Sequence, residues 1–171
     1  MIKLNKCIKS KVLKSFFYLE GNIKINSEYF IERIKQGCNQ EDNLNGQTNI
    51  KGNQTSWKYF NNDPAFLNAI DEIITCLDKN VDLPSYELKD SWGFSLGYGG
   101  KTEEHNHIPH LWSGALYLNS HKQTLDFNEI KRKVKPEPGN FVLFSAFLKH
   151  KCNQNRSKDV KWGISFNLSP R

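Results

Sequence analysis

The sequence predicts a mainly β protein with flanking helices, an α+β fold whose strands form a sandwich or small barrel. The hydrophobic pattern changes once along the 171 residues, because apolar residues follow helical spacing before about residue 85 and alternate with period two after it. The later strands are short and separated by turn signals, which is typical of sandwiches and barrels. No repeat or long linker divides the chain. We therefore expect a single domain over residues 1–171, with a mostly helical and loop region over 1–84 and the strand core over 85–168.

Two helices are predicted in the first half of the chain. Asn26 precedes apolar residues at helical spacing, which predicts a capped amphipathic helix ending near Gly37. Asp63 is the predicted N-cap of a second helix, because Pro64 suits the first helical position, where its missing N–H costs nothing. The apolar residues of this helix recur at Phe66, Ile70, Ile73, Ile74 and Leu77. We expect the second helix to pack on the outside of a sheet, and the polar stretch 38–54 to form a loop.

The second half of the chain contains the predicted strands. The first begins near Tyr86 and alternates through Trp92, Phe94, Leu96 and Tyr98. Residues 111–118 and 141–148 form the next two, and a turn sequence over 136–140 introduces the second of these. The last strand alternates most regularly, with one apolar face at Val160, Trp162, Ile164, Phe166 and Leu168. Its other face carries Lys161, Gly163, Ser165 and Asn167.

Composition excludes several classes of protein. Hydrophobic residues make up 37% of the chain and aromatic residues 12%, which is too apolar for a disordered protein. No run approaches the roughly 18 apolar residues of a membrane span, and the lysine-interrupted N-terminal segment lacks the features of a signal peptide. The net charge is +6, but the basic residues are scattered apart from a short run over 131–135, which does not favour a nucleic-acid surface.

The cysteines agree with a cytoplasmic protein that has no membrane partner, which is what we expect from the sequence. The four cysteines are far apart and form no CxxC pair. Without a secretion signal, free thiols in a reducing compartment are expected. The residues concerned are Cys7, Cys38, Cys76 and Cys152.

The histidines supply the clearest candidate for a metal site. Three of the five lie within six residues, at His105, His107 and His110. Side chains two residues apart on a strand point to the same face, so His105 and His107 can converge if the segment is extended. Imidazole is a common ligand of iron, zinc, copper and nickel. His150, at the end of an apolar strand, is the best candidate for a third ligand, whereas His121 is expected to be a surface or hydrogen-bonded residue.

The polar face of the last strand predicts an anion site. If the apolar face packs against the helices, the face with Lys161 and Ser165 points into a cavity. A lysine in a cavity is costly unless it meets an anion. A carboxylate on a small ligand is its natural partner, with the Ser165 hydroxyl as a second donor. The alternative is a solvated face on which Lys161 is an ordinary surface residue.

Taken in order, these residues form a set of motifs. They are His105-Asn106-His107, Ser-Gly-Ala-Leu-Tyr-Leu at 113–118, Pro-Gly-Asn-Phe-Val-Leu-Phe at 138–144, His150, and Lys-Trp-Gly-Ile-Ser-Phe-Asn at 161–167. The set resembles the iron(II)- and 2-oxoglutarate-dependent oxygenases, and most of all a small prolyl-hydroxylase-like group. The resemblance covers about residues 50–168, including a similar Gly-Asn-Gln-Thr-Ser-Trp stretch at 52–57. It implies a double-stranded β-helix, or jelly roll, with helices supporting one sheet.

The resemblance also implies a role for each site residue. The implied metal ligands are His105, His107 and His150. The implied co-substrate residues are Lys161, Ser165, Tyr117, Tyr98 and Ser113, with the weakest matches at Tyr98 and Ser113. Lys161 stands where most members carry the arginine that binds the distal carboxylate of 2-oxoglutarate. The implied reaction uses Fe(II), 2-oxoglutarate and oxygen, releases succinate and carbon dioxide, and hydroxylates a small molecule or a protein residue.

Two departures from the family pattern bear on the site. His107 stands where most members carry Asp or Glu, so three neutral imidazoles would leave the site one charge more positive than usual. Glu103 could supply the carboxylate instead, since it lies two residues before His105 and on the same face of a regular strand. His110 is also near enough to contribute. Lysine in place of arginine loses the bidentate fork, although it still binds a carboxylate as a point charge.

Two other functions fit parts of the pattern. A cupin-like metalloenzyme would use three histidines and no 2-oxoglutarate, but it has no use for Lys161 beside Ser165. A non-catalytic binding module on the same fold would be consistent with the missing carboxylate. The sequence identifies neither the substrate nor the oligomeric state.

Overall fold

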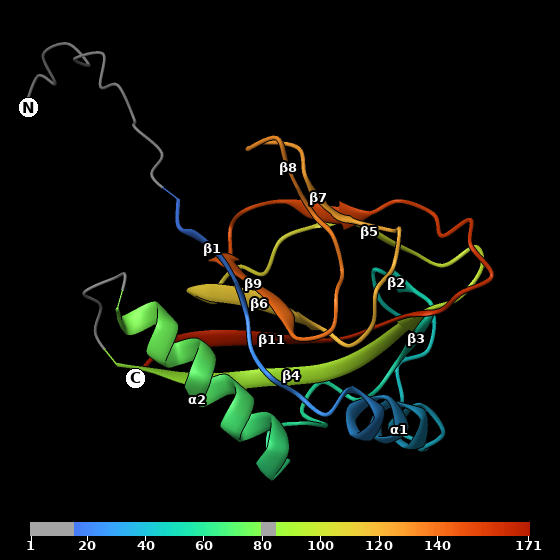
Figure 1. The fold of residues 1–171 in the computed structure, drawn as a ribbon, viewed down its shortest axis with the longest axis horizontal. Coiled ribbons are helices and arrows are strands. Elements are labelled where there is room, and N and C mark those ends of the chain that lie inside the picture. The colour runs from blue at the N-terminus through green and yellow to red at the C-terminus, as the bar shows by residue number, and fades with distance from the viewer. Residues whose placement is uncertain (1–15, 80–84) are drawn as a thin grey trace, which may run out of the picture.

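The structure is a computed structural model and describes residues 16–79 and 85–171. Over these residues, eleven strands form two antiparallel sheets that face each other (Figure 1). The larger sheet has the order β1-β9-β6-β11-β4-β3, with β1 at Tyr18–Asn22, β9 at Asn140–Ser145, β6 at Trp112–Tyr117, β11 at Lys161–Pro170, β4 at Tyr86–Leu96 and β3 at Asn53–Gln54. The smaller sheet has the order β2-β5-β10-β7-β8, with β2 at Ile50–Lys51, β5 at Lys101–His105, β10 at His150–Cys152, β7 at Leu125–Phe127 and β8 at Arg132–Val134.

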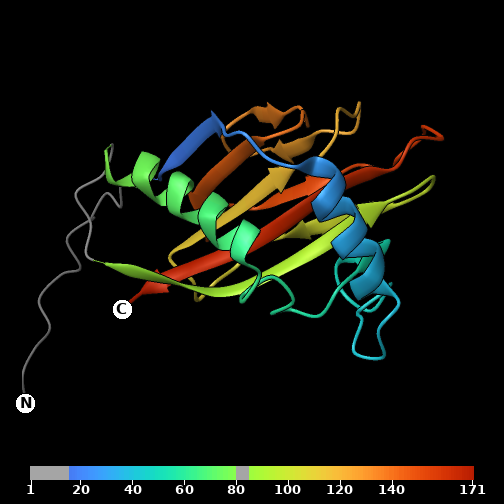
Figure 2. The ribbon, with the colours of Figure 1, turned by 60° about the horizontal axis from the view of Figure 1, so that its bottom comes forward.

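Two helices lie against the outer face of the larger sheet, as Figure 2 shows. They are α1 (Ser27–Cys38) and α2 (Pro64–Asp78). Both begin where the sequence predicts, because the side chains of Asn26 and Asp63 accept hydrogen bonds from backbone N–H groups in the first turn. The buried faces of the helices pack on the apolar face of β11 at Ile164, Phe166 and Leu168. This confirms the predicted orientation of the last strand.

The inner faces of the two sheets enclose a second apolar cluster. The larger sheet contributes Trp92, Phe94, Leu96, Ala115, Tyr117, Val142 and Phe144, and the smaller sheet contributes Ile50, Leu125, Phe127, Val134 and Cys152. Because successive residues of a strand point to opposite faces, the inward face of β11 is the one that carries Lys161 and Ser165. The polar face of the last strand therefore points between the sheets, as the sequence predicts.

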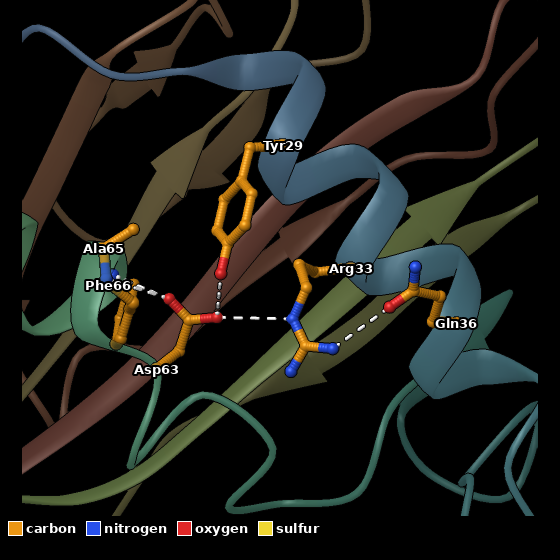
Figure 3. Close-up of polar contacts among 6 residues, drawn as sticks. All are labelled: Tyr29, Arg33, Gln36, Asp63, Ala65 and Phe66. Carbon is orange, nitrogen blue, oxygen red and sulfur yellow. Dashed lines mark hydrogen bonds and ion pairs between the residues drawn. The ribbon is translucent and has the colours of Figure 1, made fainter.

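Asp63 joins the two helices to each other. One carboxylate oxygen caps α2 by accepting from the backbone N–H groups of Ala65 and Phe66, each at 3.1 Å. The other accepts from the Tyr29 hydroxyl at 2.8 Å and from Arg33 Nε at 3.3 Å, and both of these residues belong to α1 (Figure 3). Since the Asp63 side chain is only 2% exposed, this network fixes the start of α2 against α1 beneath the sheet.

The region before residue 85 departs from the prediction, because it also contains strands. β1 pairs with β9 at one edge of the larger sheet, and the predicted loop over 38–54 contains β2 and β3, each only two residues long. These strands are stabilised by partners far along the chain, which local periodicity does not report.

Cys38 and Cys152 are buried thiols, and the predicted thiol at Cys7 lies outside the described residues. No helix in the described part of the chain is long and apolar enough to cross a bilayer.

Candidate metal centre and adjoining cavity

Three histidines converge where β5 and β10 meet. His105 and His150 are directly opposite each other in the antiparallel pair, and their ring centroids are 4.3 Å apart. His107 lies beyond the end of β5, where its backbone N–H donates to the carbonyl of Ala146 at 2.7 Å. One ring nitrogen of each histidine lies within 4.8 Å of those of the other two. These residues are the three that the sequence predicts as ligands.

Backbone carbonyls orient two of the rings. His105 Nδ1 lies 2.8 Å from the carbonyl oxygen of Glu103, and His150 Nδ1 lies 3.0 Å from that of Leu148. A nitrogen facing a carbonyl carries the proton, so these contacts assign Nδ1–H as donor and leave Nε2 with its lone pair. The Nε2 atoms of His107 and His150 are 3.2 Å apart. A carbonyl-bound Nδ1–H with a free Nε2 is the usual arrangement of metal-binding histidine.

Burial keeps these imidazoles neutral. It lowers the pKa of His107 to about 2, with the neighbouring charges of His150, His105 and His110 adding to the effect. Burial likewise lowers the pKa of His150 to about 3, with a further contribution from His105, and lowers the pKa of His105. A metal binds the neutral form of imidazole, so the cluster has the protonation state that a ligand set requires.

A β-bulge in β5 removes Glu103 from the site. His150 pairs with His105 but Cys152 pairs with Thr102, so two steps on β10 correspond to three on β5. The extra residue breaks the alternation, and Thr102 and His105 both line the cavity while Glu103 is exposed. Glu103 Oε1 lies 3.4 Å from Lys101 Nζ on the surface. The expectation that Glu103 shares a face with His105 is therefore wrong.

The two remaining histidines have other partners. His110 Nε2 lies 3.2 Å from Asp90 Oδ2, and its Nδ1 lies 3.1 Å from the Ser169 hydroxyl. It is therefore outside the cluster, although the sequence left open that it contributes. His121 is buried and hydrogen-bonded, with Nε2 at 3.1 Å from the carbonyl oxygen of Asp159, which agrees with its predicted role.

A cavity extends from the histidines between the two sheets, and Lys161 lies in its wall. The Lys161 side chain is fully buried, with 0% exposure. Its Nζ lies 3.2 Å from Cys152 Sγ and 5.2 Å from the centre of the Tyr117 ring. A buried ammonium with a thiol as its hydrogen-bond acceptor lacks a full counter-charge among the described residues. The alternative of an ordinary surface lysine is thus excluded.

Tyr117 and Ser113 line this cavity as predicted, whereas the prediction for Tyr98 needs correction. Tyr98 is 78% exposed, because it lies in the turn between β4 and β5, so it does not line the cavity. Ser165 does line the cavity, but it lies four residues along β11 from Lys161, or roughly 13 Å at strand spacing. The role of the Ser165 hydroxyl as a second donor to a bound carboxylate stays a prediction.

Solved structures with the same architecture span most of this chain. A viral collagen prolyl hydroxylase from Paramecium bursaria Chlorella virus-1, solved as a 2-oxoglutarate complex, matches with a TM-score of 0.66 and 16% identity over 90% of this chain and 96% of the viral chain. A Pseudomonas putida prolyl-4-hydroxylase matches with a TM-score of 0.67 and 13% identity, over 90% and 92% of the two chains. HygX from Streptomyces hygroscopicus, with nickel and 2-oxoglutarate bound, matches with a TM-score of 0.65 and 11% identity, over 90% and 82%. No protein-family model and no curated protein sequence matches this chain.

The chain has the double-stranded β-helix fold of the iron- and 2-oxoglutarate-dependent oxygenases. The jelly roll predicted from the ordered motifs is confirmed. Within this fold, the three histidines and Lys161 line one cavity, and strands β5, β10 and β11 carry His105, His150 and Lys161.

The sequence did not indicate two further residues that line the cavity. Cys152 contacts Lys161. Its position could have been inferred from the sequence, because Cys152 lies two residues after His150 and so shares its strand face. Trp92 lines the cavity next to His107, with ring centroids 5.9 Å apart. Its alternation identifies it as a core residue, but nothing local in the sequence places it beside the histidines.

Proposed function

We propose that this protein is an iron(II)- and 2-oxoglutarate-dependent oxygenase that hydroxylates a small molecule or a residue of a protein or peptide. One observation carries the proposal, namely that a cavity with three convergent imidazoles also holds a fully buried lysine ammonium. The imidazoles suit a cation, whereas the ammonium suits an anion. A ligand that chelates a metal at one end and carries a carboxylate at the other satisfies both.

The donor set fits ferrous iron. A cation with bonds of about 2.1 Å brings ligand nitrogens to roughly 3 to 3.5 Å from each other, and the Nε2 atoms of His107 and His150 are already 3.2 Å apart. His105 completes the set from the opposite strand. With 2-oxoglutarate and dioxygen, bound iron would supply the oxidising power for C–H hydroxylation, with succinate and carbon dioxide as co-products.

Lys161 would hold the distal carboxylate of the co-substrate. Its ammonium donates up to three hydrogen bonds, and the thiol of Cys152 is a weak acceptor for only one of them. The Tyr117 hydroxyl is buried and has no hydrogen-bond partner among the described residues, so it offers a second donor from the same cavity wall. A carboxylate that accepts from both groups would compensate the buried charge and the unpaired hydroxyl together.

Apolar residues would keep bulk water away from the reacting groups. Trp92 and Phe144 are almost fully buried and stand beside the histidines, with ring centroids 5.9 Å from His107 and 4.7 Å from His150 respectively. Trp57 packs edge-on against Trp92 at 4.8 Å and is 42% exposed. An apolar lining strengthens electrostatic contacts inside the cavity by lowering the local dielectric constant.

Anaerobic titration tests the proposal. Iron(II) is added first and 2-oxoglutarate second, while the weak metal-to-ligand charge-transfer absorption of the chelate is followed. We expect the absorption in the wild type and a much higher 2-oxoglutarate concentration for half-saturation in Lys161→Ala. Metal binding without any effect of 2-oxoglutarate would overturn the proposal.

The absence of a carboxylate ligand favours one alternative, a cupin-like three-histidine metalloenzyme that does not use 2-oxoglutarate. In the described part of the chain, the cluster of potential ligands contains no acidic residue. The same titration separates the two functions, because the alternative predicts metal binding with no charge-transfer absorption. It also assigns no purpose to the buried Lys161.

A further inference from the structure

The buried part of the cavity holds a thiol that the proposed reaction does not use. Cys152 is 5% exposed and lines the same cavity as the three histidines and Lys161. Its Sγ accepts a hydrogen bond from the Lys161 ammonium at 3.2 Å. An anion formed on this sulfur would therefore contact the group that the proposed function assigns to the co-substrate.

A second donor faces the same place. The Tyr117 hydroxyl is buried and has no hydrogen-bond partner among the described residues, and Tyr117 is 1% exposed. Its ring lies 5.2 Å from Lys161 Nζ, and Tyr117, Lys161 and Cys152 all line the same cavity. An ammonium and an unpaired hydroxyl beside one sulfur form a receptor for a small oxyanion attached to that sulfur.

We infer that Cys152 is an oxidation site, at which peroxide converts the thiol to a sulfinate that occupies the Lys161 pocket and excludes the co-substrate. The inference rests on the proposed function, because that function assigns the pocket to 2-oxoglutarate. A sulfinate carries a negative charge on two oxygen atoms, as a carboxylate does. It would form the ion pair with Lys161 within the chain, whereas 2-oxoglutarate must be drawn from solution.

The chemistry balances with hydrogen peroxide as the oxidant. In the first step the sulfur attacks one peroxide oxygen, an S–O bond forms, the O–O bond breaks, and one water leaves; the thiol becomes a sulfenic acid. A second peroxide repeats the step, releases a second water and yields the sulfinic acid, which loses its proton at neutral pH. Two molecules of peroxide are reduced for each sulfinate formed.

The other cysteines provide the comparison within the chain. Cys38 lies in the core between the helices and the outer face of the larger sheet, and burial raises the pKa of its thiol to about 11. It has no place in the cavity lining. Cys38→Ala therefore retains the pocket and removes a competing thiol, so it is the matched control for Cys152→Ala.

The experiment combines mass spectrometry with binding. The full-length, metal-free protein is treated with hydrogen peroxide, the peroxide is removed with catalase, and manganese(II) is added in place of iron. Calorimetry then measures 2-oxoglutarate affinity, and peptide mass spectrometry locates added oxygen. We expect two added oxygen atoms on Cys152 and a loss of affinity of roughly tenfold or more, since the contact with Lys161 is replaced. The same treatment should leave the affinity of Cys152→Ala where it was before treatment.

Two further variants mimic the product without an oxidant. Cys152→Asp places a permanent anion beside Lys161, and Cys152→Asn has nearly the same shape without the charge. We expect the Asp variant to bind 2-oxoglutarate more weakly than the Asn variant. Equal affinities would contradict the competition, because they would show that charge at this position has no effect on the pocket.

Failure of this inference can be told apart from failure of the proposed function. If untreated wild type does not bind 2-oxoglutarate, the proposed function fails, while the mass of the Cys152 peptide still decides whether the residue is oxidised. If untreated wild type binds and peroxide modifies only Cys38 or Cys76, the oxidation site is refuted. If Cys152 gains two oxygen atoms and affinity is unchanged, or if Cys38→Ala resists peroxide as Cys152→Ala does, the blocking role is refuted.

Discussion

His105 and His150 face each other across the antiparallel pair of β5 and β10, with their ring centroids 4.3 Å apart. Each ring is oriented by a backbone carbonyl two residues earlier in its own chain segment, through Nδ1. The two candidate ligands are therefore held by main-chain geometry, which is rigid. The third, His107, lies beyond the end of β5, and its backbone N–H is held by the carbonyl of Ala146.

Substitution of His107 tests this third position. His107→Asp should retain or improve iron(II) affinity, because it adds the negative charge that three neutral imidazoles lack. His107→Ala should weaken iron(II) binding by at least roughly tenfold, since it removes a ligand. Anaerobic titration of the wild type and both variants measures the order of affinities. Wild-type affinity in the Ala variant would show that His107 is not a ligand.

Substitution of Lys161 should separate co-substrate binding from metal binding. Lys161→Ala is expected to weaken 2-oxoglutarate binding by about ten- to a hundredfold, because a hydrogen bond to a charged group contributes roughly 1.5–3 kcal/mol. Metal affinity should change much less, since Lys161 is not part of the histidine cluster. Calorimetry gives both constants. Lys58→Ala, on an exposed lysine, is the control, and equal 2-oxoglutarate affinity in Lys161→Ala and this control would rule out the role.

As pH is lowered below about 6.5, the stability of the metal-free protein should decrease. The folded-state pKa values of His107 and His150 are about 2 and about 3, so the unfolded chain takes up these protons first as pH falls. Each neutral histidine then costs roughly 1.4 kcal/mol of stability per pH unit below its ordinary pKa of about 6.5. Urea unfolding from pH 7.5 to 5.5 in the presence of a chelator measures the slope. His107→Gln removes one titrating histidine, so the slope of stability against pH should decrease by the contribution of one proton. An unchanged slope would contradict the low folded-state pKa of His107.

The Asp63 network should contribute measurably to stability. Asp63→Ala removes the cap of α2 and the partner of Tyr29 and Arg33, so we expect a loss of roughly 2–3 kcal/mol. Asp63→Asn should lose less, because asparagine is also a good N-cap. Chemical denaturation measures both, with Tyr29→Phe as the control that removes a single hydrogen bond. Equal stability of the Ala variant and the wild type would show that α2 does not depend on this cap.

Sequence patterns predict the parts of this fold that local interactions determine. The caps at Asn26 and Asp63 and the alternation of β11 follow from residue type and spacing. His150 joins the other two histidines through the pairing of β10 with β5, so the sequence could only nominate it as a candidate. Strand β1 was not predicted, because its pairing with β9 joins residues more than a hundred positions apart. The prediction that Glu103 shares a face with His105 was wrong for a related reason. Its face is set by the register of β5 against β10, which a single strand does not encode.

The bulge in β5 lets two residues an odd number of positions apart line one cavity. Thr102 and His105 both face inward only because the strand carries one residue more than its partner. Removal of Glu104 would place the threonine and the histidine two positions apart, so regular alternation would keep both facing inward and only the bulge would be lost. Deletion of this exposed residue should therefore leave metal binding intact, as should most substitutions at the same position. The odd spacing of Thr102 and His105 in the sequence thus records a change of strand register that a strict period of two conceals.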